Sequence, residues 1–361
     1  MIHVLVVDDS AVVRKVLTDE LSKYEDIKVV GSAADPYIAR DKIVSLAPDV
    51  ITLDIEMPRM DGLSFLERLM KHHPLPVIVV SSVAPRSSQA AIKALALGAV
   101  DVIAKPNGSY SVPDVGRDLV RAIRTAARAR FRQPAKVEVP TRAEPVVIGA
   151  GTAHTILAIG ASTGGTKAIE AVLTRLPADT PGTVIVQHMP AGFTRSFAAR
   201  LDERSAMEVR EAVDNDLVEP GLALIAPGGY HLLLQRGGRG TYSVRVKDGP
   251  PVHHQRPAVD ILFHSVAQQA GGNAVGVLLT GMGADGARGL LAMREAGAHT
   301  IAEAESSCVV FGMPREAIEL GAAAEVAPLH TIASRIAVAL RASSTPRRGE
   351  TSVATALLHS S

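Results

Sequence analysis

Short runs of β-branched and aliphatic residues alternate with amphipathic segments along the first third of the chain. The runs have the length and composition of buried parallel strands, and the segments between them show the three- to four-residue apolar spacing of helices. The predicted strands are residues 3–7, 28–30, 50–53, 77–80 and 100–103, and the predicted helices are residues 10–23, 35–46, 60–71, 87–97 and 114–130. Five strand–helix units predict a doubly wound parallel α/β domain over residues 1–130.

The alternation of strand and helix patterns is interrupted after residue 130 and resumes at residue 153. Residues 131–152 contain three prolines among mixed charges and show no amphipathic period, which predicts a linker. Residues 153–342 return to α/β alternation, and residues 343–361 are small and polar, which predicts a disordered tail. In the second domain the predicted strands are residues 155–159, 183–187, 222–226, 242–246, 273–280 and 299–303, and the predicted helices are residues 166–176, 192–203, 257–270, 284–296 and 331–341.

Composition narrows the class of protein. The chain has 361 residues, with 38 basic and 37 acidic side chains, so bulk charge gives no support for a nucleic-acid partner. Its single cysteine excludes an internal disulfide and fits a reducing compartment, and we read Cys308 as a small buried residue. No apolar run reaches the ~18 residues of a membrane span, and the start of the chain has no signal-peptide pattern. We therefore expect a cytoplasmic protein without membrane insertion.

Polar residues stand at the ends of the predicted strands of the first domain. Asp8 and Asp9 follow the first strand, Asp54 the third, Ser81 the fourth and Lys105 the fifth. In a parallel sheet these ends meet at one edge, where converging carboxylates need a cation such as Mg²⁺. A carboxylate beside Mg²⁺, with a lysine and a hydroxyl near it, can accept a phosphoryl group.

Residues 1–130 resemble a response-regulator receiver domain, which has a flavodoxin-like (βα)5 fold. The matching motifs are VVDDS at 6–10, DIEMPRMDG at 54–62, VVSS at 79–82 and AKP at 104–106. The resemblance implies phosphorylation of Asp54, a Mg²⁺ ion held by Asp9, Asp54 and the Glu56 carbonyl with help from Asp8, and phosphoryl contacts from Ser81 and Lys105. The chain has Val102 where many receivers have an aromatic switch residue, so we expect signal output through a packed domain interface.

The same strand-end rule identifies three residues of the second domain. Ser162 follows the strand at 155–159, His188 follows the strand at 183–187, and Asp285 follows the strand at 273–280. A histidine held by a carboxylate can take the proton of a serine hydroxyl near neutral pH. Glycines around Met282 would let backbone N–H groups approach a developing oxyanion. Asp285 is also a candidate N-cap for the helix that follows it.

The glycine-rich turn at Gly160–Gly165 has two readings. It presents Ser162 as a nucleophile on a Gly-x-Ser-x-Gly elbow, or it cradles a phosphate at a helix N-terminus. A phosphate loop needs lysine directly after the last glycine, whereas here Thr166 precedes Lys167. His253 and His254 are adjacent and do not have the spacing of a metal-binding pair.

Residues 153–342 resemble the catalytic domain of the CheB-type protein-glutamate methylesterases. The matching stretches are IGASTGGTKAI, VIVQHMPAGFTRSFAARL, IAPGGYHLLL, DGPPVHHQRPAVDILFHSVA, GVLLTGMGADGARGL and CVVFGMPREAI. The resemblance implies a doubly wound, mostly parallel hydrolytic domain with Ser162 as nucleophile, His188 as base, Asp285 as orienting acid and the Met282 N–H in the oxyanion hole. It implies methylated chemoreceptor cytoplasmic domains as substrate, a chemotaxis histidine kinase as phosphodonor, and no cofactor in the second domain.

These patterns together predict a phosphorylation-gated serine hydrolase that demethylates glutamate methyl esters and deamidates glutamines on chemoreceptors. We expect the first domain to pack over the second and to block it until Asp54 is phosphorylated. Two alternatives remain: a non-catalytic phosphosignal adaptor, and a nucleotide-binding enzyme that uses the Gly160–Gly165 loop. Arginines 117, 121, 124 and 128 recur at helical spacing and form a solvated face or a docking surface.

Overall fold

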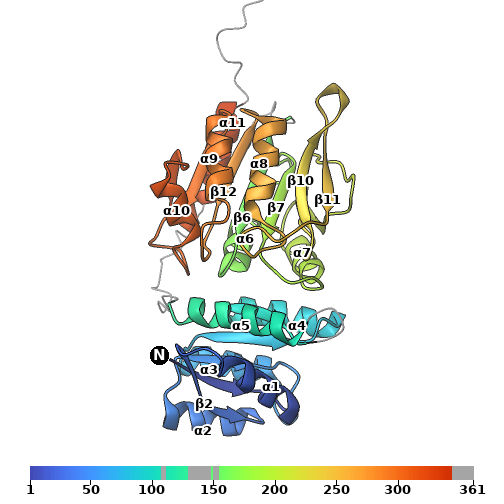
Figure 1. Ribbon diagram of the computed structural model, residues 1–361. Helices are drawn as coiled ribbons and strands as arrows, with labels where there is room; N and C mark the ends of the chain where they lie inside the picture. The colour runs from blue at the N-terminus through green and yellow to red at the C-terminus, as the bar shows by residue number, and fades with distance from the viewer. Residues whose placement is uncertain (107–110, 129–147, 149–153, 344–361) are drawn as a thin grey trace, which may run out of the picture.

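The N-terminal domain is a five-stranded parallel sheet with helices on both faces (Figure 1). The structure is a computed structural model and describes residues 1–106, 111–128, 148 and 154–343. The strands lie in the order β2-β1-β3-β4-β5, so the chain reverses direction across the sheet between β1 and β3. Their bounds are β1 Ile2–Val7, β2 Ile27–Ala33, β3 Val50–Leu53, β4 Val77–Ser81 and β5 Asp101–Ala104.

Four of the five described helices of this domain begin after a capping side chain, and α4, which follows Ala84, does not. Ser10, Asp35, Asp61 and Ser111 each accept a hydrogen bond from a backbone amide in the first turn of the helix that follows. The helices are α1 Ala11–Leu21, α2 Pro36–Leu46, α3 Gly62–His72, α4 Pro85–Leu97 and α5 Val112–Ala126. All five predicted helices are present, but α5 ends at Ala126, so Arg128 lies beyond the helix that carries the other three arginines.

The C-terminal domain is built on a seven-stranded parallel sheet of order β14-β13-β12-β6-β7-β9-β8. Strand β6 lies at its centre, with β7 on one side and β12 on the other, so this sheet also has a topological switch point. An antiparallel hairpin, β10 with β11, stands apart from the sheet. The strands are β6 Ile156–Ala161, β7 Thr183–Gln187, β8 Glu208–Glu211, β9 Leu222–Ile225, β10 His231–Arg236, β11 Tyr242–Lys247, β12 Ala274–Leu278, β13 His299–Glu303 and β14 Glu325–Ala327.

Helices cover both faces of this sheet (Figure 1). They are α6 Gly165–Leu173, α7 Thr194–Asp202, α8 Val259–Ala270, α9 Ala287–Glu295, α10 Met313–Glu319 and α11 Leu329–Ser343, and a 3₁₀ turn spans Gly238–Gly240. The sequence did not predict β8, β10, β14 or α10. Strands β8 and β14 are short, charged edge strands, and α10 has only seven residues, too few to show a helical period.

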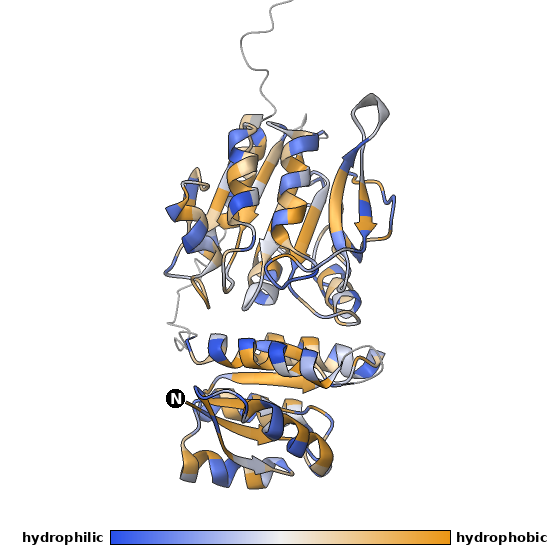
Figure 2. Ribbon diagram, viewed as in Figure 1, coloured by the Kyte–Doolittle hydropathy of each residue, from blue (hydrophilic) through white to orange (hydrophobic). Residues whose placement is uncertain are grey.

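Apolar side chains line the strands of both sheets, whereas hydrophilic residues gather on the outer faces of the helices (Figure 2). One buried apolar cluster includes residues of both domains, among them Leu95 of α4 and Phe197 of α7. Helix α4 contacts α6 and α7, and a methyl group at Gly192, just before α7, would lie 3.2 Å from Val83. The predicted packing of the first domain against the second is therefore present.

Two predicted segments fall largely outside the described residues. These are the linker at 131–152, of which only Ile148 is described, and the tail at 343–361, of which only Ser343 is described. The side chain of Ile148 is buried in the cluster that joins the domains. Among the described helices, none has both the length and the apolar character needed to cross a bilayer.

Candidate active site

Strand register brings Ser162 and His188 together. Ala161 of β6 pairs with Gln187 of β7, so Ser162 and His188 occupy the next position on two neighbouring strands. The His188 amide donates to the Ala161 carbonyl at 3.1 Å, and the Ser162 amide donates to the Thr280 carbonyl, beyond β12, at 3.0 Å. Ser162 therefore lies at the switch point of the sheet, where ligands of doubly wound folds bind.

The His188 ring is held by Asp285. Its Nε2 lies 2.7 Å from Asp285 Oδ2, and the side chains are only 5% and 2% exposed. Burial opposes ionisation of Asp285, but its hydrogen bonds with His188 and with two backbone amides hold the pKa of Asp285 below its usual value. An ionised carboxylate only accepts hydrogen bonds, so Nε2 carries the proton and Nδ1 has the free lone pair.

That lone pair has no partner within the part of the chain that the structure describes. His188 Nδ1 is buried without a hydrogen bond, and the hydroxyl of the half-buried Ser162 makes none with the described residues. In free enzymes the hydrogen bond between nucleophile and base is often long and tightens when substrate binds. The ring nitrogen without a partner here is Nδ1, whereas the base nitrogen of chymotrypsin-type triads is Nε2.

Asp285 has a structural role different from the one predicted. It does not cap its own helix: Gly286 is the N-cap of α9 and provides no side chain. Instead the Asp285 carboxylate accepts hydrogen bonds from the first two amides of α8, those of Val259 at 2.8 Å and Asp260 at 2.9 Å. The residue before α8, Ala258, has no capping group, so Asp285 supplies the cap from a distant part of the chain.

Gln187 links Ser162 to His188. Its side-chain amide donates to the Ser162 carbonyl at 2.8 Å and to the His188 carbonyl at 3.0 Å. This bridge fixes the two strand ends relative to one another. Sequence reasoning did not identify Gln187, because its importance depends on the pairing of β6 with β7.

The loop after β12 forms the other wall of the site. Gly281 packs so closely on Ser162 that a methyl group there would lie 2.7 Å from the Ser162 Cβ, and Gly312 packs on the backbone of Gly281 and Gly283. The Met282 amide donates to no acceptor among the described residues. An N–H group without an internal acceptor, next to a serine, is what an oxyanion hole requires.

The glycines of the turn at Gly160–Gly165 serve close packing. A Cβ at Gly160 would lie 2.2 Å from Val259, and one at Gly165 would lie 2.1 Å from Gln187. Gly164 has φ of +81°, which favours glycine, and a Cβ there would lie 2.7 Å from Val309. The glycine pattern is thus accounted for by the elbow itself, without a phosphate.

The N-terminal domain brings a second set of polar groups together. Carboxylate oxygens of Asp8, Asp9 and Asp54 lie within 4.8 Å of one another at the switch point between β1 and β3. Lys105 Nζ lies 2.8 Å from carboxylate oxygens of both Asp8 and Asp54. Burial raises the pKa of Asp54 despite Lys105; these ion pairs raise the pKa of Lys105 despite its burial.

These three carboxylates suit Mg²⁺, which prefers hard oxygen ligands. Ser81 lies beside Lys105, because the Lys105 amide donates to the Ser81 carbonyl at 2.8 Å. The Glu56 amide donates to Asp54 at 3.3 Å, while the Glu56 side chain accepts a hydrogen bond from Ser87 of α4. Residue 56 thus connects the carboxylate cluster to a helix that contacts the C-terminal domain.

The predicted arginine face lies close to the loop after β12 that carries Met282. Arg117, Arg121 and Arg124 of α5 line a cavity of about 290 Å³, and Met282 lines it from the other domain. Each arginine forms an ion pair within its own domain, with Asp114, Asp118 and Asp26 respectively. These acids offset the charge of the stripe, and the shared cavity places part of the stripe at the boundary with the C-terminal domain.

Other buried polar residues support the site, and the sequence did not single them out. Glu303 is fully buried and accepts hydrogen bonds from the Thr280 amide and from Ser307, both at 2.9 Å. Asp260 is 4% exposed and contacts His253, 3.1 Å away. The adjacent histidines are visible in the sequence, but their spacing argues only against a metal-binding pair and does not predict the contact with Asp260. Cys308 is buried, and burial raises the pKa of its thiol, as expected for an unreactive residue.

Comparison with known proteins agrees with this geometry. The family model for the CheB methylesterase domain matches residues 157–336, and that for the response regulator receiver domain matches residues 4–112. A protein-glutamate methylesterase/protein-glutamine glutaminase of Syntrophus aciditrophicus is 58% identical, over 93% of this chain and 98% of that protein. One from Anaeromyxobacter dehalogenans is 55% identical, over 93% of this chain and 94% of that protein.

The fold of the C-terminal domain is also similar to that of a solved structure. The crystal structure of the Thermotoga maritima CheB methylesterase catalytic domain is 39% identical and superposes with a TM-score of 0.50, covering 51% of this chain and 97% of that chain. Sequence identity along nearly the full length and the matching catalytic-domain fold lead to one conclusion. The chain belongs to the family of CheB protein-glutamate methylesterases/protein-glutamine glutaminases that carry an N-terminal response regulator receiver domain.

Proposed function

We propose that this chain is a phosphorylation-activated serine hydrolase of chemotaxis, which hydrolyses glutamate methyl esters on chemoreceptors to release methanol and deamidates receptor glutamines. The observation that carries the chemistry is the His188 ring, which Asp285 holds through Nε2. Its Nδ1 has no partner among the described residues, and the neighbouring strand β6 ends one residue before Ser162. The relatives, named for both activities, support the choice of substrate.

The first half of the reaction acylates Ser162. Nδ1 of His188 takes the proton as Ser162 Oγ attacks the ester carbonyl, and the Asp285 carboxylate stabilises the imidazolium that forms. The Met282 amide donates a hydrogen bond to the oxyanion of the tetrahedral intermediate. The C–O bond to the methoxy group then breaks, His188 returns its proton to the leaving oxygen, and methanol departs.

The second half frees the enzyme. A water molecule gives a proton to His188 and attacks the acyl carbonyl, and the Ser162 ester bond breaks as the proton returns to Oγ. The product is a glutamate side chain. For a glutamine substrate the same steps release ammonia in place of methanol, because the proton of His188 goes to the leaving nitrogen.

Control by phosphorylation would act through the carboxylate cluster. Asp54 accepts the phosphoryl group from a histidine kinase, and Lys105 and Ser81 contact it. Asp9, Asp54 and the Glu56 carbonyl would hold Mg²⁺, with help from Asp8, and the ion would neutralise charge on the phosphoryl oxygens. Lys105 must leave one of its two carboxylate partners when it moves to the phosphoryl group, which changes the charges around Glu56.

Helix α4 would transmit this change. Its Ser87 bonds to Glu56, and its apolar residues share a buried cluster with α7. Helix α5 stands beside the oxyanion loop across a cavity that Met282 lines. We propose that α4 and α5 in these positions keep a substrate helix away from Ser162, and that phosphorylation shifts the population toward a state with the two domains apart.

Methanol release from methylated receptor fragments, with and without acetyl phosphate, tests the proposal. We expect acetyl phosphate to increase the rate in the wild type and to leave the rate of Asp54→Asn unchanged. If the wild type released no methanol under either condition but still bound the receptor, the chain would act as an adaptor. Methanol release that is equal with and without the phosphodonor would remove the gating and keep the hydrolase.

A further inference from the structure

Two histidines occupy a turn that does not favour them. His253 and His254 are the central residues of a tight turn closed by hydrogen bonds between Val252 and Gln255, at 3.0 and 2.8 Å. Both have positive φ, +50° and +61°, the signature of a type I′ turn. Asn-Gly is the preferred pair in such a turn, because side chains with a bulky Cβ are strained in the left-handed region. Strain of this kind points to a role for one of the side chains.

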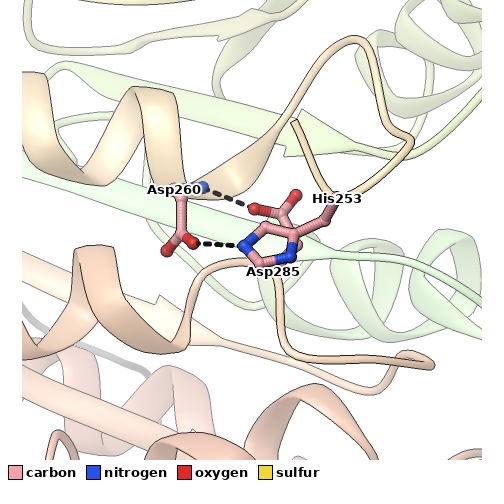
Figure 3. A group of neighbouring side chains, drawn as sticks. All are labelled: His253, Asp260 and Asp285. Carbon is pink, nitrogen blue, oxygen red and sulfur yellow. Dashed lines mark hydrogen bonds and ion pairs between the residues drawn. The ribbon is translucent and has the colours of Figure 1, made fainter. Parts of the chain in front are cut away.

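Only one of the two imidazoles contacts the site. His253 Nε2 lies 3.1 Å from Asp260 Oδ2, as Figure 3 shows. Both histidines are exposed, with 39% of the His253 side chain accessible, but His254 makes no hydrogen bond with the described residues. The turn therefore places the His253 ring on Asp260, and His254 provides a natural comparison in the same backbone conformation.

Asp260 links two helix N-termini. It is the second residue of α8, and its other oxygen, Oδ1, accepts a hydrogen bond from the Gly289 amide in the first turn of α9 at 2.7 Å. Asp285 stands just before α9 and accepts from the first two amides of α8. Each helix thus receives its cap from a carboxylate associated with the other, and the two first turns are locked together.

This lock determines where Asp285 lies. Figure 3 shows the hydrogen bond between the Asp260 amide and the Asp285 carboxylate. The same carboxylate contacts the His188 ring, so a shift of the first turn of α8 moves the ring. Ligand atoms of His253, Asp260 and Asp285 lie within 4.8 Å of one another, but both Asp285 oxygens already accept hydrogen bonds from N–H groups. The cluster is therefore a hydrogen-bonded support and not a cation site.

We propose that His253 and Asp260 are positioning residues for the hydrolysis: together they fix the first turn of α8 against α9, and through it the Asp285 carboxylate and the His188 ring. This inference rests on the proposed function, because it assumes that His188 and Asp285 carry out the proton transfer. The strained turn places the His253 ring against Asp260.

The pair of variants His253→Gly and His254→Gly tests the proposal in the full-length protein. Glycine relieves the positive-φ strain at either position, so we expect neither variant to have a lower melting temperature than the wild type. With methylated receptor as substrate, we expect kcat of His253→Gly to fall by roughly 10- to 100-fold with KM within about twofold, since small displacements of catalytic groups cost that much. His254→Gly should keep the wild-type kcat.

A conservative and a non-conservative substitution of Asp260 test the same proposal. Asp260→Asn keeps an oxygen that can accept from the Gly289 amide, so we expect it to retain kcat within about fivefold, whereas Asp260→Ala loses at least as much as His253→Gly. Wild-type kcat in His253→Gly, or an equal loss in His254→Gly, would overturn the inference. Neither result would touch the proposed function, which fails separately if Ser162→Ala still releases methanol at the wild-type rate.

Discussion

The two domains place their polar residues at the same point of the fold, but the polar groups are ion-paired in one domain and partly unpaired in the other. Both are doubly wound parallel sheets, and both gather their polar residues at the switch point, between β1 and β3 in one sheet and around β6 in the other. In the N-terminal domain Lys105 is paired with two carboxylates at 2.8 Å. In the C-terminal domain His188 Nδ1 is buried and has no hydrogen-bond partner among the described residues. In our proposal the charges of the first site receive a cation and a phosphoryl group, whereas the Nδ1 lone pair of the second takes a proton.

The difference extends to how each site is supported. The N-terminal site comes from β1, β3 and β5, and its charged groups hold one another directly. The C-terminal site depends on a frame of surrounding hydrogen bonds, from Gln187, the α8 amides and Glu303. Variants of the frame should therefore impair catalysis without touching Ser162, and variants of the N-terminal site should change activation alone.

The largest effect is expected at Asp285. Asp285→Asn replaces an acceptor of the His188 Nε2 proton with a side chain that can donate, which favours the wrong tautomer of the ring. We expect kcat/KM for methanol release to fall by about 10³- to 10⁴-fold. In the Ser162→Ala background the same substitution should cost nothing further, because residues that act as a unit are not additive. An additional loss in the double variant would contradict the shared mechanism.

The second largest effect on kcat is expected for the loop after β12 that carries Met282. A methyl group at Gly312 would lie 2.7 Å from the Gly281 carbonyl and 2.9 Å from the Gly283 amide, so Gly312→Ala must displace the loop that carries Met282. We expect a loss of about 10²-fold in kcat with the triad intact. Gly238→Ala is the matched control, since nothing lies within 4 Å of a methyl group there. Equal kcat values for the two variants would show that the loop takes no part.

A smaller effect is expected on activation. Ser87→Ala removes the hydrogen bond to Glu56, and we expect it to lower the stimulation by acetyl phosphate by about two- to fivefold while basal methanol release is unchanged. Ser88 is the control: it is buried in the same helix, and its hydroxyl has no hydrogen bond within the described residues. Full stimulation of Ser87→Ala would exclude Glu56 from the route between the domains.

The smallest effect concerns stability. Burial raises the pKa of Glu303 in the folded protein above its unfolded value, so its destabilising contribution is absent below the unfolded pKa and grows as pH rises toward the folded one. Glu303→Gln should therefore be more stable relative to wild type at pH 8 than at pH 4, by thermal unfolding. The exposed Glu319→Gln removes the same charge and should show no such trend.

Alternation of hydrophobic runs and amphipathic segments predicted both sheets, because buried parallel strands have a simple pattern, and the strand-end rule placed Ser162, His188 and Asp285 on one edge. Three contacts could not be predicted from the sequence pattern. The pairing of Asp285 with α8, the His253–Asp260 contact and the link from Glu56 to Ser87 each join elements distant in the chain, and no local pattern records them. Strand β10 was missed although its partner β11 was predicted, because HLLLQR lacks the alternation of polar and apolar residues that YSVRVK shows.

The central claim is that Ser162 is a nucleophile activated by His188. Labelling of the full-length protein with a fluorophosphonate, followed by peptide mapping, tests this directly. We expect a single adduct on Ser162 that forms much more slowly in His188→Ala and does not form in Ser162→Ala. An adduct on another serine, or labelling of Ser162 at the same rate without His188, would contradict it.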